Sequence, residues 1–163
     1  MSATTHLLTP IGPLALVGTE AGLSAVGFLD DATVAATAPT AVPACLQEAH
    51  RQLRAYFRRE LREFSLTYAP DFGTDFQRQV WTALVGIGYG RTGSYLDVAK
   101  ALNNPKSVRA VGAANGQNPL AIVWPCHRII GADGSLTGYA GGIHRKKWLL
   151  EFEQPTRQGG LFG

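Results

Sequence analysis

The sequence predicts an α/β chain of the α+β type, with a small N-terminal antiparallel β-sheet domain that carries a helix and a mainly helical C-terminal domain. Three observations support this prediction: two short apolar runs flank a turn near the N-terminus, apolar residues recur at helical spacing over 46–64, and two helix-start signals follow in the second half. The chain has 163 residues, of which 45% are hydrophobic and 17% charged, as in globular proteins. We expect a domain boundary between residues 1–71 and 72–163.

The N-terminal elements are a hairpin and a helix. The runs GPLALVGT (12–19) and LSAVGFLD (23–30), joined through the turn EAG, predict two antiparallel strands. The apolar residues of 46–64 lie on one face of a helix, which indicates an amphipathic helix packed on the hairpin. The segment FSLTY (64–68) is a candidate third strand, and APDFGT (69–74) is the expected linker.

The C-terminal half contains three expected helices. Thr74 with Gln77 forms a capping-box pattern, and the helix that it starts is expected to stop at the glycines of GIGYG (86–90). Ser94 with Asp97 repeats the pattern and opens a helix over 94–102. Pro105 suits the first turn of the next helix, expected to include 106–115. Two short helices across a tight turn are typical of a helix-turn-helix.

The second helix of this pair carries small residues and one long basic side chain. Two interpretations are open: the small residues allow close packing on another helix, or they let the helix approach a nucleic-acid groove, with Arg109 projecting into it. The uneven charge favours a polyanionic partner, since residues 72–163 hold ten Lys/Arg against five Asp/Glu, a net +5, and residues 1–71 hold five against seven, a net −2. The small residues are Ala110, Gly112, Ala113 and Ala114.

Membrane and metal sites are not expected. No apolar run approaches the roughly 18–20 residues of a membrane span, and the N-terminus lacks the basic start of a secretory signal. Two cysteines form a poor disulfide framework, so we expect reduced thiols in a cytoplasmic protein, with Cys45 a small buried hydrophobic residue. The cysteines and histidines are too scattered for a zinc site, and no cofactor is expected.

In the segment NPLAIVWPCHR (118–128), an apolar run is followed by a thiol, an imidazole and a guanidinium group. A thiolate is the nucleophilic form of cysteine, so Cys126 needs a group that accepts its proton. His127 is adjacent, but neighbouring side chains on an extended segment point apart, so a bridging water is the more plausible link. Glu153, on an expected C-terminal helix, is a candidate partner for the ring. The alternatives are a chance Cys-His pair and a solvated carboxylate.

The motifs of the C-terminal half resemble one known family. GTDFQRQVWTAL, NPKSVRAVGAANGQNP, IVWPCHRII, GSLTGYAGG and KKWLLEFE occur in the order and spacing of the O6-alkylguanine-DNA alkyltransferases, also called methylated-DNA–protein-cysteine methyltransferases. The resemblance is nearly continuous from residue 73 to 153 and looser before it. It implies a ribonuclease H-like N-terminal domain and a C-terminal domain for DNA binding and alkyl transfer.

The resemblance also implies an activity and catalytic roles. Cys126 would take the alkyl group from O6-alkylguanine, and from O4-alkylthymine, in a single irreversible turnover that needs no cofactor. His127 would accept the thiol proton through water while Glu153 orients the ring. Tyr95 would donate a hydrogen bond or proton to the departing purine, and Asn118 would be the hinge between the DNA-binding helix and the active-site strand.

The same resemblance implies how substrate and DNA are held. Main-chain groups of Cys126, Ile129 and Ala140 would contact the flipped base, with Tyr139 as a wall. The helix with the small residues would enter the minor groove of duplex DNA, and Arg109 would fill the space of the extruded base. A monomer is expected, and cooperative binding along DNA is left open.

Two other functions are possible alternatives. A cysteine hydrolase would leave the helix-turn-helix unexplained, and a non-catalytic damage sensor or DNA-binding regulator would not need Cys126. Two positions depart from the family pattern, Trp124 on the apolar run and Gly88 in GIGYG. Arg128 is expected to brace the loop that follows it.

Overall fold

The computed structural model describes residues 2–69 and 73–154, which group by their contacts into two units. The first is Met1–Thr74 with Pro119–Val123, and the second is Asp75–Asn118 with Trp124–Gly163. The linker predicted at 69–74 includes residues 70–72, which lie outside the described residues. In the described part of the chain, no helix combines the length and apolar character needed to span a bilayer.

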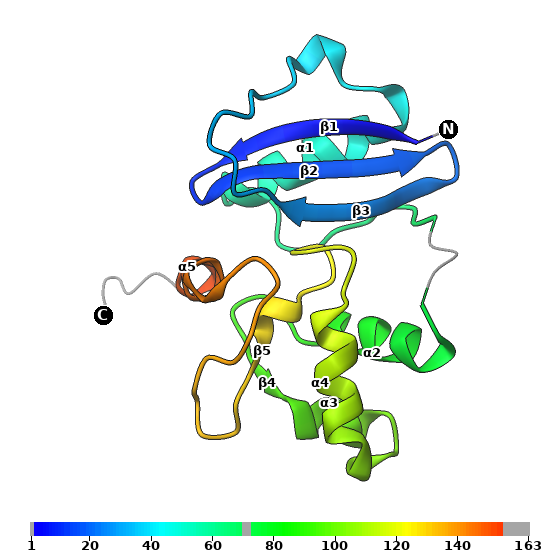
Figure 1. The fold of residues 1–163 in the computed structure, drawn as a ribbon, viewed down its shortest axis with the longest axis vertical. Coiled ribbons are helices and arrows are strands. Elements are labelled where there is room, and N and C mark those ends of the chain that lie inside the picture. Colours follow the sequence, from blue (N-terminus) through cyan, green and yellow to red (C-terminus); the bar gives the residue numbers. More distant parts are fainter. Residues whose placement is uncertain (1, 70–72, 155–163) are drawn as a thin grey trace. The chain divides into compact units, whose positions relative to one another are not determined.

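The first unit is built on an antiparallel sheet in the order β1 (Ala3–Thr9), β2 (Gly12–Thr19) and β3 (Gly22–Phe28), with α1 (Gln47–Phe57) packed against it (Figure 1). The predicted hairpin is β2 and β3, and it is confirmed. The strand β1 was not predicted; it pairs with β2 from Ala3 opposite Gly18 to Thr9 opposite Gly12. Burial alternates at Thr5 and Leu7 on this strand, but the sequence does not show the alternation, because Thr5 is polar and Leu7 is followed by the exposed Leu8.

The prediction of a helix over 46–64 is wrong at its C-terminal end, because α1 ends at Phe57. Arg59 adopts a left-handed conformation, with φ 63°, and the Glu60 amide donates to the Ala55 carbonyl at 2.8 Å, a bond that closes a helix terminus. The chain then turns back beside β3. The candidate strand at 64–68 pairs there in parallel through a single bridge, with Leu23 N–H donating to the Thr67 carbonyl at 2.9 Å.

The apolar run before Cys126 is not the strand that the sequence suggested. It makes one bridge to β3, with Val26 N–H donating to the Pro119 carbonyl at 2.9 Å and Ala121 N–H donating to the Val26 carbonyl at 3.0 Å. Ile122 then has φ 70°, a left-handed conformation that a β-branched residue rarely adopts and that ends the extended segment. The run is buried because it adds to the core of the first unit.

The second unit contains the three predicted helices, α2 (Asp75–Val85), α3 (Tyr95–Ala101) and α4 (Val108–Gly116), which pack on one another, and α5 (Ile143–Glu153) (Figure 1). The capping box at Ser94 is confirmed: its Oγ accepts from Asp97 N–H at 3.0 Å, and the Asp97 carboxylate accepts from Ser94 N–H at 2.9 Å. A short parallel pair, β4 (Gly93–Ser94) and β5 (Ile129–Ile130), joins the start of α3 to the segment after Cys126.

Trp124 is accommodated by a second indole of the same unit. Its ring stacks on Trp81 of α2, with centroids 5.6 Å apart and planes 20° apart, and both side chains are buried. Trp81 Nε1 donates to the Ala114 carbonyl of α4 at 2.8 Å. Trp124 therefore packs the chain before Cys126 on α2, and Trp81 in turn links α2 to α4.

Candidate active site

Cys126 begins a short 3₁₀ turn, η4 (Cys126–Arg128), and does not lie on an extended segment as the sequence analysis assumed. Cys126 N–H donates to the Trp124 carbonyl at 2.8 Å, and Arg128 N–H donates to the Pro125 carbonyl at 3.0 Å. With about three residues per turn, successive side chains leave the axis in different directions. A 3₁₀ turn, like the extended segment that was expected, directs the side chains of Cys126 and His127 apart.

His127 and Glu153 form a buried pair, as the sequence analysis proposed. Nε2 of His127 lies 2.8 Å from Oε2 of Glu153, and both residues are almost fully buried. Burial lowers the pKa of His127, which keeps the ring neutral despite the neighbouring carboxylate. Because a carboxylate only accepts hydrogen bonds, the ring hydrogen lies on Nε2, and Nδ1 carries the lone pair. Nδ1 is buried and has no hydrogen-bond partner among the described residues, so it is available as a base.

Arg128 is the third member of this cluster, and the sequence analysis missed its role. Its Nε donates to Oε1 of Glu153 at 2.7 Å, its Nη2 donates to Oε2 at 3.0 Å, and its Nη1 donates to the Ile87 carbonyl at 2.6 Å. Burial alone would raise the pKa of Glu153, but the bonds from His127 and Arg128 outweigh it and lower that pKa to about 2. Glu153 is therefore ionised at neutral pH, and Arg128 provides the compensating charge. A basic residue next to the histidine in sequence was the available signal.

The thiol of Cys126 is protonated at rest. Its residue is 6% exposed, and burial raises its pKa to about 11, opposed by a hydrogen bond from the Asn118 side chain and by the charge of Lys146. Asn118 also donates through Nδ2 to the Trp124 carbonyl at 2.7 Å, so this side chain ties the end of α4 to the turn that carries the thiol. A protonated, buried thiol requires a base during reaction.

The remaining predicted site residues lie in the second unit. Tyr95 opens α3, and its hydroxyl hydrogen-bonds Thr137 Oγ1. Ile129 is buried, and its N–H donates to the Cys126 carbonyl, whereas Ala140 is exposed. The Tyr139 hydroxyl is buried and has no hydrogen-bond partner within the described residues; burial, with the nearby Cys126, raises its pKa well above the usual value. Tyr139 is near enough to Cys126 for the charge of one to affect the other, and its role as a wall of the pocket stays a prediction.

The predicted DNA-binding residues of α4 separate into two faces. Arg109, Ala110 and Ala113 are exposed, and a side chain at Gly112 would touch the ring of Tyr95 at 3.7 Å. Ala114 is only 2% exposed, so grouping it with the groove-facing residues is wrong: it belongs to the packing interpretation. The packing interpretation therefore applies to the buried face of the helix, and the approach of its exposed face to nucleic acid stays a prediction.

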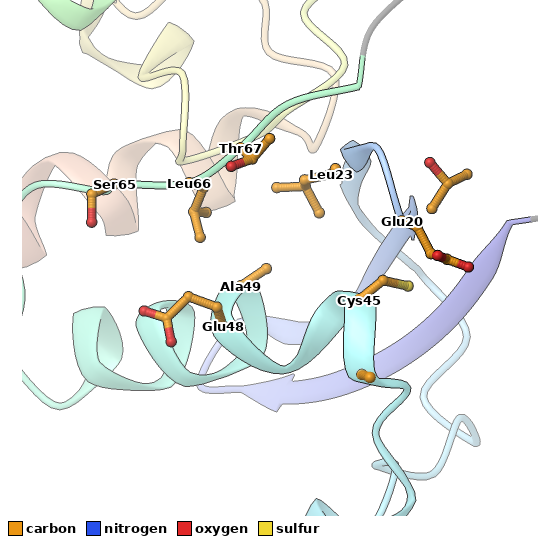
Figure 2. Close-up of a pocket in the computed structure, with 11 residues that line it drawn as sticks. Glu20, Leu23, Cys45, Glu48, Ala49, Ser65, Leu66 and Thr67 are labelled. Carbon is orange, nitrogen blue, oxygen red and sulfur yellow. The ribbon is translucent and has the colours of Figure 1, made fainter.

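Cys45 lies in a different environment. It lines a pocket of about 690 Å³ within the first unit, together with Glu20, Glu48 and nonbasic neighbours (Figure 2). None of the described residues that line this pocket is a histidine, lysine or arginine, so neither an imidazole nor a cation from this lining lowers the pKa of a thiol there. Both cysteines are free thiols. Within 2–69 and 73–154, no group of three or more His, Cys, Asp or Glu side chains is arranged to hold a metal ion.

With this geometry established, comparison with known proteins identifies the family. Residues 75–155 match the family described as 6-O-methylguanine DNA methyltransferase, DNA binding domain, and residues 4–70 match its ribonuclease-like domain. The chain belongs to the 6-O-methylguanine DNA methyltransferase family.

Individual members of this family are similar along nearly the whole chain. A methylated-DNA–protein-cysteine methyltransferase of Methanosarcina acetivorans is 48% identical over 147 residues, which are 89% of this chain and 94% of the relative. The crystal structure of Mycobacterium tuberculosis O6-methylguanine methyltransferase matches with a TM-score of 0.81 and 43% identity, covering 96% of each chain. A structure of M. tuberculosis OGT in complex with DNA matches with a TM-score of 0.80 and 46% identity, covering 93% of this chain and 94% of that one.

Proposed function

We propose that this methyltransferase repairs O6-alkylguanine in DNA by moving the alkyl group to its own Cys126 in a single turnover. The observation that carries the proposal is the buried His127–Glu153 pair, which leaves an unprotonated imidazole nitrogen on the residue next to a protonated thiol. A sensor that only binds damaged DNA needs no such base, so this pair argues against the non-catalytic alternative.

The bonds, electrons and protons of the transfer balance without a cofactor. His127 Nδ1 accepts the thiol proton through a water molecule, and the sulfur then attacks the alkyl carbon in line with the C–O6 bond. The sulfur–carbon bond forms as the carbon–oxygen bond breaks, and the electron pair of the broken bond goes to the purine. The purine takes up one proton and becomes guanine, so protons balance. The thioether product is a very poor leaving group, and the protein stays alkylated.

The surrounding residues support this step. Asn118 hydrogen-bonds the sulfur and offsets part of the cost of forming a buried thiolate. Tyr95 is proposed to donate to the purine as negative charge develops on it. The main chain of Cys126, Ile129 and Ala140, with Tyr139 as a wall, holds the base. The same pocket is proposed to accept O4-alkylthymine.

DNA is proposed to bind on the exposed face of α4. Ala110 and Ala113 leave this face shallow, as a minor-groove contact requires, and Arg109 is the exposed long side chain that would replace the extruded base. Extrusion is needed because O6 of a stacked guanine cannot reach a buried thiol, and it costs a few kcal/mol, least for a damaged pair. A reactive thiol must stay reduced, so we propose that the protein acts in the cytoplasm. We also propose that it acts as a monomer.

The test is the intact mass of the protein after incubation with duplex DNA carrying O6-methylguanine. We expect a gain of one methyl group, mapped by peptide analysis to Cys126. Cys126→Ala should bind the duplex and gain nothing, and Cys45→Ala should react like the wild type. No gain by the wild type, or methylation of the Cys126→Ala variant, would overturn the proposal.

A further inference from the structure

Arg145 occupies a place in α5 that helix stability does not explain. It lies in the first turn of the helix, which contains no acidic residue. The free amide groups of a first turn carry a partial positive charge, so a carboxylate is favoured there and a cation is not. Arg145 is also only 5% exposed, and burying a guanidinium group is costly unless it is hydrogen-bonded. A residue that departs from both local rules is expected to have a role elsewhere in the structure.

The Arg145 side chain reaches back to the turn that precedes the helix. Side chains of an α-helix lean toward its N-terminus, and Nη1 of Arg145 donates to the Gly141 carbonyl at 3.0 Å. Burial raises the pKa of Tyr139 well above its usual value, and the charge of Arg145 opposes this rise, so these two side chains are also close. Arg145 therefore acts on the residues on both sides of Ala140.

Residues 139–142 form a β-turn with Ala140 and Gly141 at its centre. Gly142 N–H donates to the Tyr139 carbonyl at 2.8 Å, which closes the turn. The peptide bond between Tyr139 and Ala140 is planar and trans, so the Ala140 N–H points opposite to the Tyr139 carbonyl, away from the inside of the turn. It makes no hydrogen bond to the described residues. An outward N–H is what a main-chain contact from Ala140 to a base requires.

The turn belongs to a segment that has little regular structure of its own. Residues 131–142, between β5 and α5, include five glycines and no described helix or strand. Glycine loses more conformational entropy than other residues when it is ordered, so a turn of Ala140 followed by two glycines is poorly held by its own backbone. The bond from Arg145 ties this turn to a helix and restricts its orientation.

We propose that Arg145 is a positioning residue for the substrate: by holding the Gly141 carbonyl, it fixes the 139–142 turn so that the Ala140 N–H is directed at the extruded base. The inference rests on the proposed function and deepens it. It predicts an effect on how tightly the alkylated purine is bound, and little effect on the reactivity of the Cys126 thiol. The sequence analysis did not single out Arg145.

The test separates binding of the purine from chemistry at the sulfur. Alkylation of Cys126 by free O6-benzylguanine is followed by intact mass over a range of concentrations, which gives a half-saturating concentration and a limiting rate. Arg145→Met removes the donors and keeps an unbranched apolar stem. We expect the half-saturating concentration to rise about tenfold, as for a lost hydrogen bond from a charged donor, and the limiting rate to stay within about threefold of the wild type. Iodoacetamide has no purine to be held, so it should alkylate Cys126 of this variant within about twofold of the wild-type rate.

Three further variants control for structure. Arg145→Lys keeps a cationic donor and should restore the half-saturating concentration to within about threefold of the wild type. The amide nitrogen of Arg145→Gln takes the place of Nε and ends short of the Nη1 position, so this variant should behave like Arg145→Met. Lys147→Met changes an exposed residue of α5 and should match the wild type.

Hydrogen exchange tests the turn directly. In Arg145→Met the peptide that contains residues 139–142 should exchange about fivefold faster or more, because the Gly142 N–H loses its protection as the turn loosens. Urea unfolding checks each variant, and the contrast between Arg145→Gln and Arg145→Lys decides the question if Arg145→Met does not fold.

A half-saturating concentration within about twofold of the wild type for Arg145→Met or Arg145→Gln would overturn the proposal. Unchanged hydrogen exchange in the turn, or a limiting rate that falls as much as the half-saturating concentration rises, would also overturn it. Failure of the wild type to methylate Cys126 from duplex O6-methylguanine would instead overturn the proposed function, and the hydrogen-exchange comparison would still test whether Arg145 holds the turn.

Discussion

Replacement of Glu153 by glutamine tests the base at the centre of the site. The carboxylate holds the hydrogen of His127 on Nε2 over a distance of 2.8 Å and accepts two bonds from Arg128. In Glu153→Gln the side-chain amide can donate to Nε2, which moves the ring hydrogen to Nδ1. Nδ1 can then no longer take a proton from the thiol.

Two effects of the Glu153→Gln substitution are expected, a slower methyl transfer and a lower free energy of unfolding. Loss of a general base, or a wrong histidine tautomer, slows comparable reactions by roughly 10²–10⁴-fold, so we expect a methyl-transfer rate at least about a hundredfold below that of the wild type. Arg128 is 5% exposed and would keep its charge without a carboxylate, which costs about 3–5 kcal/mol when one partner of a buried pair is removed. The bond to the Ile87 carbonyl remains and favours the lower end of this range.

The assay is a rapid-quench single turnover on duplex O6-methylguanine read by intact mass, together with urea unfolding of the same samples. Glu151→Gln is the matched control, because it makes the same change at an exposed position two residues earlier in α5. We expect this control to match the wild type in both rate and stability. A folded Glu153→Gln protein that transfers within threefold of the wild-type rate would refute the assignment of His127 as the base.

Three further predictions concern stability and DNA. The pKa of Glu153 is about 2 in the folded protein and 4.5 ordinarily, so its ionisation stabilises the fold above pH 4.5. The free energy of unfolding in urea should fall by roughly 3 kcal/mol as the pH drops from 4.5 to 2. A Glu153→Gln protein that loses as much stability over this range would contradict the assignment. Arg109→Ala should slow repair in duplex DNA about tenfold or more and leave the reaction with free O6-benzylguanine nearly unchanged; equal losses on both substrates would argue against a role in base extrusion. Trp124→Ala should lower the free energy of unfolding by about 3–5 kcal/mol, because it removes the partner stacked on Trp81; a cost below 1 kcal/mol would show that the stack is not structural.

Sequence patterns correctly predicted the elements whose conformation depends on neighbouring residues. The Ser94–Asp97 capping box, the glycines that end α2 and the alternating strands of the hairpin each depend on neighbouring residues, and each was found where expected. Contacts with distant partners, such as the bridge from β3 to Leu120, were not predicted, and one local turn was also missed. The helix over 46–64 was extended too far because its apolar period continues past Arg59, and the left-handed turn there is not visible in that period.

The site shows the same division. The sequence alone predicted Cys126 as the nucleophile, His127 as its base and Glu153 as the carboxylate, because the three residues occur in a motif set with a fixed order. Only the tertiary structure decided that Arg128 shares the carboxylate, that Lys146 is buried beside Thr137, and that Trp124 stacks on Trp81. The residues of these pairs are 9 to 43 positions apart in the sequence. The sequence does not show whether folding will bury a charged or aromatic side chain, or which partner will offset the cost of burying it.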